Sequence, residues 1–161
     1  MHLMMWPEWD HEVFFLIHEL ELPAFLESLF VLARNKLTWI PMYVVLLALL
    51  ALRKRLRIWI YVLGIIACVA AADGLSSQII KPTVERLRPC RAMPDQVDER
   101  IPCGSGYSFP SAHATNHFAL ALLLMAYFDP NDFCRWLLLA WAALISFCQV
   151  FVGVHFPVDI L

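Results

Sequence analysis

The sequence predicts an all-α fold: a bundle of helices integral to a membrane. Two observations lead to this prediction. Of the 161 residues, 61% are hydrophobic and 16% are charged, whereas soluble proteins average about 45–50% and about 25%. The hydrophobic residues also form long uncharged runs with short charged segments between them. One domain of this length cannot bury so much apolar surface, which excludes a disordered chain, a secreted mini-protein and an ordinary cytosolic enzyme.

Residues 1–36 are expected to form an interfacial amphipathic segment. Charged residues interrupt this segment so often that it has no uncharged run long enough to cross a bilayer. It is not a signal peptide, because it lacks a basic start and its apolar stretches contain acidic residues. Its phenylalanine and leucine residues suit helices that lie in the membrane interface. Helices packed on the rest of the protein are the alternative.

Four spanning helices are expected within the remaining membrane-embedded domain, residues 37–161. The apolar runs cover residues 37–52, 58–80, 111–128 and 136–154. A basic cluster of Arg53, Lys54, Arg55 and Arg57 ends the first run. The second run contains one ionisable residue, Asp73. A carboxylate inside a span is costly, so we interpret it as facing the protein interior, either bonded to a neighbouring helix or in a functional site.

The order of these crossings brings two distant polar segments to one face of the membrane. Residues 81–110 and 155–159 fall on one side, and residues 53–57 and 129–135 fall on the other. The first side gathers Lys81, Arg88, Ser111, His113, His155 and Asp159. Cations and the amides of a helix N-terminus bind phosphate oxygens, and arginine does so through a planar fork. One histidine could attack phosphorus while the other donates a proton, and a carboxylate could orient the first.

Three blocks of residues resemble motifs of the type 2 phosphatidic acid phosphatase superfamily, which includes the vanadium haloperoxidases. Residues 81–89 are similar to its K-x6-R-P motif, and residues 110–113 are similar to P-S-G-H. His155 and Asp159 match the end of S-R-x5-H-x3-D. The order and spacing agree across all three blocks, from residue 81 to the end of the chain. A haloperoxidase is disfavoured because the known relatives of that kind are soluble.

The resemblance implies a metal-independent membrane lipid phosphatase without a cofactor, which hydrolyses a lipid phosphate or pyrophosphate. His155 would be the nucleophile that forms a phosphohistidine, His113 the acid and Asp159 the partner of His155. The phosphate binders would be Lys81, Arg88, Ser111, Ala112 and Gln149. Its substrates would resemble undecaprenyl pyrophosphate, phosphatidylglycerol phosphate, phosphatidic acid or the phosphates of lipid A. Its partners would be this substrate and membrane lipids, with no nucleic acid.

The chain departs from the family pattern in three places. Ala112 replaces a glycine, which is a small change. Gln149 replaces an arginine, and a charge-assisted hydrogen bond is worth about 1.5–3 kcal/mol against about 1 for a neutral one. Arg86 and Arg91, on either side of Arg88, could replace the lost charge, but we interpret them as solvated loop residues. A catalytically impaired lipid-binding or lipid-transport protein on the same scaffold is therefore the alternative function.

The third departure is the end of the chain, which stops at Leu161. Family members usually continue into another spanning helix, so we expect a fifth helix, truncated, that begins near Pro157. The resemblance also places the active site at the outer face of the inner membrane. The count of lysine and arginine residues argues for the opposite orientation, and we discount it because catalysis would hold Lys81 and Arg88 in place.

Two further hypotheses concern cysteine and histidine residues. Cys90 and Cys103 flank the polar loop, so we expect a disulfide if that loop lies in an oxidising compartment. His113 and His117 have a spacing that can bind metal. Other evident ligands are lacking apart from His155, so we interpret His117 as a hydrogen-bonded interior residue and expect no metal.

Overall fold

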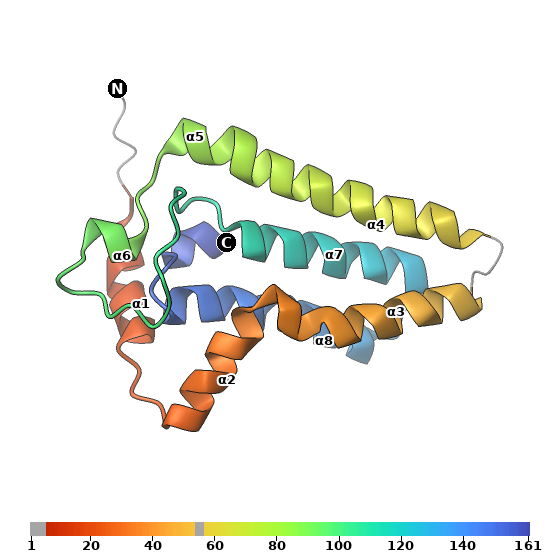
Figure 1. Cartoon of the computed structure of the whole chain (residues 1–161), viewed down its shortest axis with the longest axis horizontal. Coiled ribbons are helices and arrows are strands. Elements are labelled where there is room, and N and C mark those ends of the chain that lie inside the picture. The colour runs from red at the N-terminus through yellow and green to blue at the C-terminus, as the bar shows by residue number, and fades with distance from the viewer. Residues whose placement is uncertain (1–5, 54–56) are drawn as a thin grey trace.

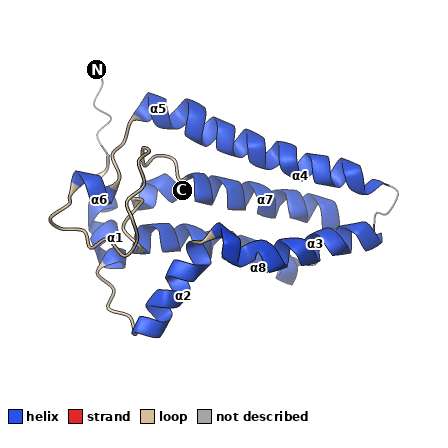
Figure 2. Ribbon diagram, viewed as in Figure 1, coloured by secondary structure: helices blue, strands red, loops and turns tan. Residues whose placement is uncertain are grey.

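The computed structural model describes residues 6–53 and 57–161, and all regular secondary structure in these ranges is helical (Figures 1 and 2). Lys54 and Arg55 of the basic cluster lie outside the described residues. The first half comprises α1 (Glu8–His18), α2 (Ala24–Arg34), η1 (Lys36–Trp39), α3 (Ile40–Arg53) and α4 (Ile58–Asp73). The second half comprises the π-helix η3 (Gly74–Ile80), α5 (Lys81–Val84), α6 (Pro89–Ala92), α7 (Ala112–Phe128), α8 (Asp132–Phe151) and η4 (Pro157–Ile160).

Four long helices, α3, α4, α7 and α8, run side by side along the molecule (Figure 1). Helix α7 lies between α4 and α8 and packs on both. The Tyr127 side chain of α7 reaches Gly64 on α4, where an added Cβ would lie 1.9 Å from its hydroxyl. A larger residue at this position would force the Tyr127 side chain to move.

Side chains at the helix ends explain where α7 and α8 begin. The Ser111 hydroxyl accepts a hydrogen bond from the amide of Ala114, and Asn131 caps α8 through the amide of Cys134. Serine and asparagine are preferred at this position because their oxygens satisfy amides that lack a partner within the helix. Helix α7 therefore begins one residue later than the expected span, and α8 begins four residues earlier and ends at Phe151.

Two helical segments are long and apolar enough to cross a membrane: Ile58–Ala92 and Asp132–Phe151. A third is present if Ala24–Arg34 and Lys36–Leu52, which meet at a bend of 78°, form one broken span. Helix α7 is 17 residues long. The expectation of four spans, and of a fifth that begins near Pro157, therefore stays a prediction. In the described chain, residues 157–160 form only a single 3-10 turn, η4.

The first two helices pack on the end of α8. Phe14 of α1 is fully buried, and its ring lies 5.3 Å from that of Phe156. In α2 the ring of Phe30 meets Phe151 edge-on at 5.1 Å. Helix α1 thus packs on the rest of the protein, and the interfacial position of residues 1–36 stays a prediction. Helix α2 contains no fully buried residue and covers α8 with one face only.

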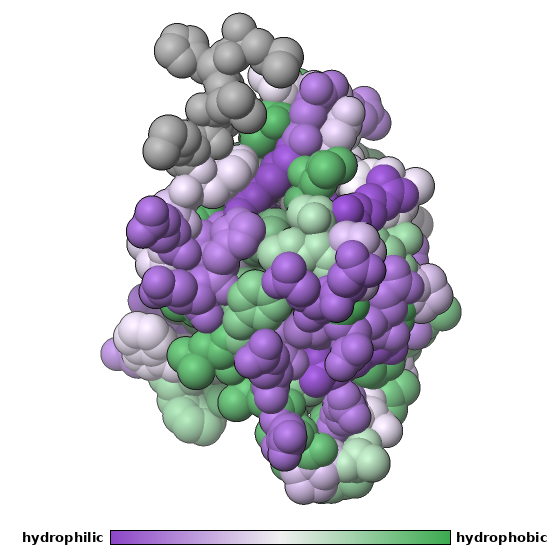
Figure 3. All heavy atoms as spheres, turned by 90° about the vertical axis from the view of Figure 1, so that its left-hand side faces the viewer, coloured by the Kyte–Doolittle hydropathy of each residue, from purple (hydrophilic) through white to green (hydrophobic). Residues whose placement is uncertain are grey.

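The chain reversals place the polar loop, α1 and the C-terminal turn at one end of the bundle (Figure 1). The amide of Ser111 donates to the Asp159 carbonyl at 2.7 Å, and the Cys90 amide donates to the Gly153 carbonyl at 3.3 Å. The two polar segments expected on one face thus meet in space. Figure 3, which views this end, shows a predominantly hydrophilic surface.

Candidate active site

A sharp turn after α8 carries His155 into the interior of the polar end. Gly153 has φ 83°, a left-handed conformation that side chains disfavour. An added Cβ there would lie 2.9 Å from Val97 and 3.0 Å from His18, so space also requires glycine. The carbonyl of Gln149 accepts hydrogen bonds from the amides of Val154 and His155, at 3.2 and 3.3 Å. These contacts leave His155 only 2% exposed.

Asp159 lies beside His155 because the 3-10 turn η4 reverses the chain between the two residues. Its Oδ2 is 3.4 Å from His155 Nδ1 and accepts the amide of Phe156 at 2.7 Å. The Ser108 hydroxyl donates to the same oxygen and lies 3.3 Å from His155 Nδ1. The imidazole is therefore held through Nδ1. Its other nitrogen, Nε2, faces Arg88 Nη1 at 3.3 Å.

Burial sets the charge state of this pair. Loss of solvation lowers the pKa of His155 to about 4, although Asp159 acts in the opposite direction. Burial by itself would raise the pKa of Asp159, but the hydrogen bonds and charges of His155, Arg86 and Ser108 outweigh it and lower that pKa. At neutral pH the pair is a neutral imidazole next to a carboxylate, which is the state a histidine nucleophile requires.

Arg86 is an interior residue, so the interpretation of Arg86 as a solvated loop residue is wrong. Its guanidinium donates to Asp159 Oδ1 at 2.8 Å and to the carboxylate of Asp10 in α1. It also lies between the rings of Trp6 and Phe156, 3.9 and 4.0 Å from their centroids. Two carboxylates and two aromatic faces compensate for the loss of water, and the residue is only 6% exposed.

Arg91, by contrast, is exposed, as the sequence interpretation proposed. Its Nη1 donates to the carbonyl of Ser105 at 2.8 Å. The backbone carbonyl is uncharged, so this contact does not neutralise Arg91, and its charge is solvated by water.

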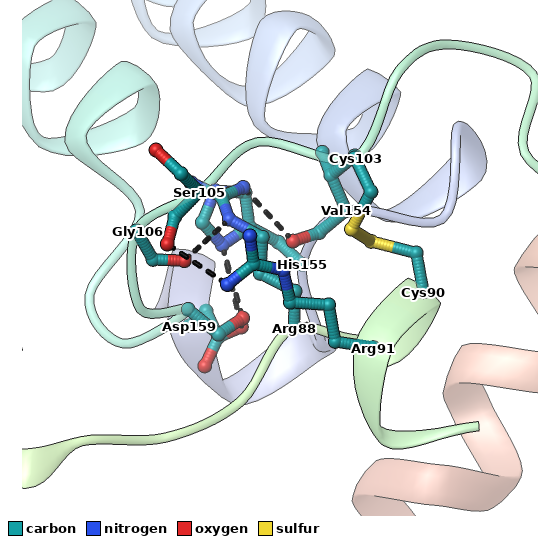
Figure 4. The surroundings of a disulfide bond; sticks show 10 residues. Arg88, Cys90, Arg91, Cys103, Ser105, Gly106, Val154, His155 and Asp159 are labelled. Atoms are coloured by element: carbon teal, nitrogen blue, oxygen red, sulfur yellow. Dashed lines mark hydrogen bonds and ion pairs between the residues drawn. A yellow bond between two sulfur atoms is a disulfide. The ribbon is translucent and has the colours of Figure 1, made fainter. Parts of the chain in front are cut away.

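Lys81 and Arg88 both reach the His155 region and are held by backbone carbonyls. Arg88 donates through Nε to Gly106 at 3.0 Å and through Nη1 to Val154 at 3.2 Å (Figure 4). Lys81 Nζ donates to the carbonyls of Tyr107 and Ser108 at 2.6 and 3.2 Å. Because carbonyls orient these side chains without neutralising them, both cations remain available to an anion.

A disulfide joins Cys90 and Cys103, whose Cα atoms are 6.1 Å apart (Figure 4). It connects α6 to the part of the loop that carries Gly106, one of the partners of Arg88. Cys68, Cys134 and Cys148 are free.

The start of α7 supplies Ser111, Ala112 and His113. Ser111 is fully buried and uses its hydroxyl to cap the helix. Ala112 is the first helical residue, so its backbone needs no glycine. His113 is half-buried, and its ring is parallel to that of His117 at 6.3 Å.

His117 is hydrogen-bonded in the interior, in agreement with its interpretation from the sequence. Its Nδ1 is 2.7 Å from the His113 carbonyl, and its Nε2 is 3.3 Å from the Tyr43 hydroxyl on α3. Within the described ranges, no group of three or more histidine, cysteine or acidic side chains is arranged to hold a metal ion. Asp73 likewise bonds a neighbouring helix, since the side-chain amide of Asn116 on α7 donates to it at 3.4 Å.

Gln149 contributes its backbone to the site, as described above, but its side chain has no partner. The side chain is 1% exposed, and neither amide atom makes a hydrogen bond within the described residues. The site therefore contains a buried neutral amide where the family motif has a cation.

Sequence reasoning missed Ser108, Asp10 and the role of Arg86. Ser108 is three residues before Ser111 in the polar loop, so its place beside a motif block was a usable signal. Asp10 carried no such signal, because its contact with Arg86 joins residues 76 positions apart.

The fold and the site together define a class: an integral membrane protein of α-helices, with a buried His–Asp pair and cations that remain available to an anion. A sequence model of the PAP2 superfamily matches residues 57–161. The chain belongs to the PAP2 superfamily.

Two curated relatives and two solved structures are similar to the chain. The lipid A 4'-phosphatase of Porphyromonas gingivalis is 31% identical over 96% of this chain, and that of Bacteroides thetaiotaomicron is 31% identical over 79%. The chain spans 66% and 58% of the lengths of these relatives.

The crystal structure of Aquifex aeolicus LpxE has a TM-score of 0.71 and 23% identity, over 99% of this chain and 90% of that one. The PAP2-type phosphatidylglycerolphosphate phosphatase of Bacillus subtilis has a TM-score of 0.67 and 21% identity, over 94% and 75%. At these identities the two structures support the fold.

Proposed function

We propose that the chain is a membrane lipid phosphatase that hydrolyses a lipid phosphate or pyrophosphate through a phosphohistidine on His155. One observation carries the proposal: a buried, neutral His155 is fixed through Nδ1 by Asp159, while its Nε2 faces the cation Arg88. Such a nitrogen can attack phosphorus, and the arginine can neutralise the phosphate oxygens.

In the first step, His155 Nε2 forms a bond to phosphorus as the bond from phosphorus to the lipid oxygen breaks. The negative charge of the bound phosphate favours the protonated form of His113, which donates a proton to that leaving oxygen. The carboxylate of Asp159 stabilises the positive imidazole ring of the phosphohistidine. In the second step, neutral His113 accepts a proton from water, and the water oxygen forms a bond to phosphorus as the bond between phosphorus and His155 Nε2 breaks and returns its electron pair to the imidazole. Inorganic phosphate leaves and His155 is neutral again. No step in this scheme requires a metal ion.

An apolar cavity beside the site supports a lipid substrate. It has a volume of about 380 Å³ and lies between α3, α4 and α7. Apolar side chains dominate its wall, including Leu46, Leu47, Ile65, Val69, Leu120 and Leu124. His117, one helical turn after His113, also lines it. An acyl chain in this cavity would place its headgroup at the start of α7, next to the proposed acid.

We further propose a lipid A type of substrate and an extracytoplasmic site in the inner membrane. Both curated relatives are named lipid A 4'-phosphatase, which supports this headgroup over the other three candidates. The disulfide between Cys90 and Cys103 supports the orientation, because disulfides persist in oxidising compartments.

Phosphate release tests the function. The full chain in detergent micelles would be assayed on lipid A, phosphatidylglycerol phosphate, undecaprenyl pyrophosphate and phosphatidic acid. His155→Ala should lower turnover of the preferred lipid by about 10³-fold or more. Phe133→Ala is the control, since this exposed side chain lies at the opposite end of the bundle. Quenching during turnover with an alkaline denaturant, which preserves the acid-labile bond between phosphorus and nitrogen, should trap labelled phosphate on wild-type protein and none on His155→Ala.

Unchanged turnover by His155→Ala would overturn the mechanism. Binding of these lipids without phosphate release from any of them would favour the alternative, a lipid-binding or lipid-transport protein. The observation that motivates the alternative is Gln149, which brings no charge to the site.

A further inference from the structure

We propose that Arg34, at the end of α2 and outside all three motif blocks, is a phosphate-binding residue that supplies the positive charge missing at Gln149. The inference rests on the proposed phosphatase function and adds a residue to its substrate site.

Gln149 brings no positive charge to the site. Its side chain is buried, and its two amide atoms lack partners in the described chain. Its carbonyl holds the amide of His155, so the residue lies directly beside the proposed nucleophile. A neutral amide offers a phosphate dianion weaker hydrogen bonds than a guanidinium does. A second cation near this position would restore the electrostatic stabilisation.

Aromatic contacts fix the position of α2 against α8. Phe30 contacts Phe147 and Phe151 on α8, with ring centroids 5.9 and 5.1 Å apart. Further along the chain, Trp39 lies 5.6 Å from Trp141. Arg34 falls between these two contacts, and it is one helical turn after Phe30 and so shares its face. It therefore lies opposite the stretch of α8 between Trp141 and Phe147, which directly precedes Cys148 and Gln149.

The bend after α2 is fixed by hydrogen bonds, so Arg34 has a defined position. The indole Nε1 of Trp39 donates to the carbonyl of Ala33 at 2.7 Å, and the Thr38 hydroxyl donates to that of Leu32, also at 2.7 Å. The side chain of Asn35 accepts the amide of Leu37 at 3.0 Å. Such a corner can present a guanidinium with little loss of conformational freedom.

The Nε donor of Arg34 lacks a hydrogen-bond acceptor among the described residues. This nitrogen is buried, and no ion pair of Arg34 occurs within residues 6–53 and 57–161. Arg86, Arg100 and Arg135 all pair with carboxylates. A buried donor without an acceptor costs about 1–3 kcal/mol. A phosphate oxygen would satisfy this donor.

The guanidinium of Arg34 acts electrostatically on that of Arg88. Burial lowers the pKa of Arg88, Asp159 opposes this, and the positive charge of Arg34 acts in the same direction as burial. Arg34 and Arg88 repel one another, and the partners of Arg88 among the described residues are two carbonyls and an imidazole. A phosphate dianion bound near both cations would replace this repulsion with two attractions. The arrangement thus favours an anion beside His113 and His155.

The test is a charge exchange between positions 34 and 149. Arg34→Gln should lower kcat/KM for the preferred lipid about 10²-fold, which is typical of losing one donor to the transition state. Arg34→Lys should lose less, because the charge remains. The double variant Arg34→Gln with Gln149→Arg should regain at least about tenfold over Arg34→Gln. Arg135→Gln, an exposed arginine at the far end of α8, is the matched control and should keep full activity.

Inhibition by orthovanadate, an analogue of phosphate, gives a second readout. The inhibition constant should rise at least about tenfold in Arg34→Gln and fall again in the double variant. A purely structural role for Arg34 would lower the thermal midpoint without this pattern of rescue.

The outcomes separate this inference from the proposed function. Full activity and unchanged vanadate inhibition in Arg34→Gln, with His155→Ala inactive, would overturn the role of Arg34 and leave the function standing. Activity in His155→Ala would overturn the proposed function itself. If Arg34→Gln fails to fold, the double variant decides, since a folded protein without regained activity or vanadate inhibition contradicts the inference.

Discussion

The two ends of the helical bundle are stabilised in opposite ways. The polar end contains buried charges in specific pairs, such as Arg86 with Asp10 and Asp159, and a disulfide. Towards the other end, α4 has no buried residue, and Trp59 is 74% exposed. Directional contacts position the chemistry, whereas the apolar surface of α4 suits a membrane that contacts it without specific partners. Substitutions at the polar end should therefore lower the stability of the fold much more than substitutions at the other end.

The largest effect is expected from Arg86→Leu. This change leaves two buried carboxylates without their cation, which costs about 3–5 kcal/mol and corresponds to a fall of roughly 10 °C in Tm. Arg91→Leu is the control, because Arg91 is exposed and binds only a carbonyl. Thermal unfolding of both variants in detergent checks the difference. Equal shifts would show that the Arg86 network does not stabilise the fold.

The next effect is expected at the disulfide. Replacing Cys90 and Cys103 together by serine removes a link across a sequence separation of 13 residues. Closure of a loop of this size is worth about 3 kcal/mol, so Tm should fall by roughly 8 °C. A reductant should lower the Tm of the wild type by a similar amount and leave the double variant unchanged. Cys134→Ser, at an exposed free cysteine, should have no effect.

Stability should also depend on pH through His155. Its pKa in the folded protein is about 4, below the ordinary value of 6.5. Between these values the unfolded chain binds a proton and the folded chain does not, so stability is lost as the pH falls from about 6.5 to 4. The contribution is on the order of 3 kcal/mol. A Tm titration checks it: the slope should be smaller in His155→Gln, and an unchanged slope would contradict the prediction.

The smallest effect is expected at the far end of the bundle. Arg135 pairs with Asp129 at 2.8 Å, but the two side chains are 45% and 90% exposed. Exposed ion pairs contribute about 0–1 kcal/mol. Arg135→Gln should therefore change Tm by less than about 2 °C. A fall as large as that of Arg86→Leu would contradict the distinction between the two ends.

The sequence predicted the parts of the site that depend on short spacing. His155 and Asp159 are four residues apart, and the turn between them brings their side chains together. The crossing order also predicted that Lys81, Arg88 and Ser111 would gather near this pair. These features follow from helix geometry and from the alternation of apolar and polar segments.

Contacts between distant segments could not be predicted in this way. Arg86 looks like a loop cation in the sequence, and only the folded chain places Asp10 and Asp159 on either side of it. The number of spans could not be fixed either. Periodicity does not reveal that α2 and α3 meet at 78°, or that a π-helical segment continues α4. These features depend on packing between helices.

The contact between Asp10 and Arg86 also determines the side of the membrane on which the first helix lies. Asp10 belongs to α1 and Asp159 to the candidate site, and one guanidinium touches both carboxylates. Helix α1 must therefore face the same compartment as the site. A topology reporter attached to the exposed surface of α1, at Glu12 for example, would reveal the compartment that receives the proposed reaction's phosphate. The orientation of the site can thus be measured without disturbing any residue that forms it.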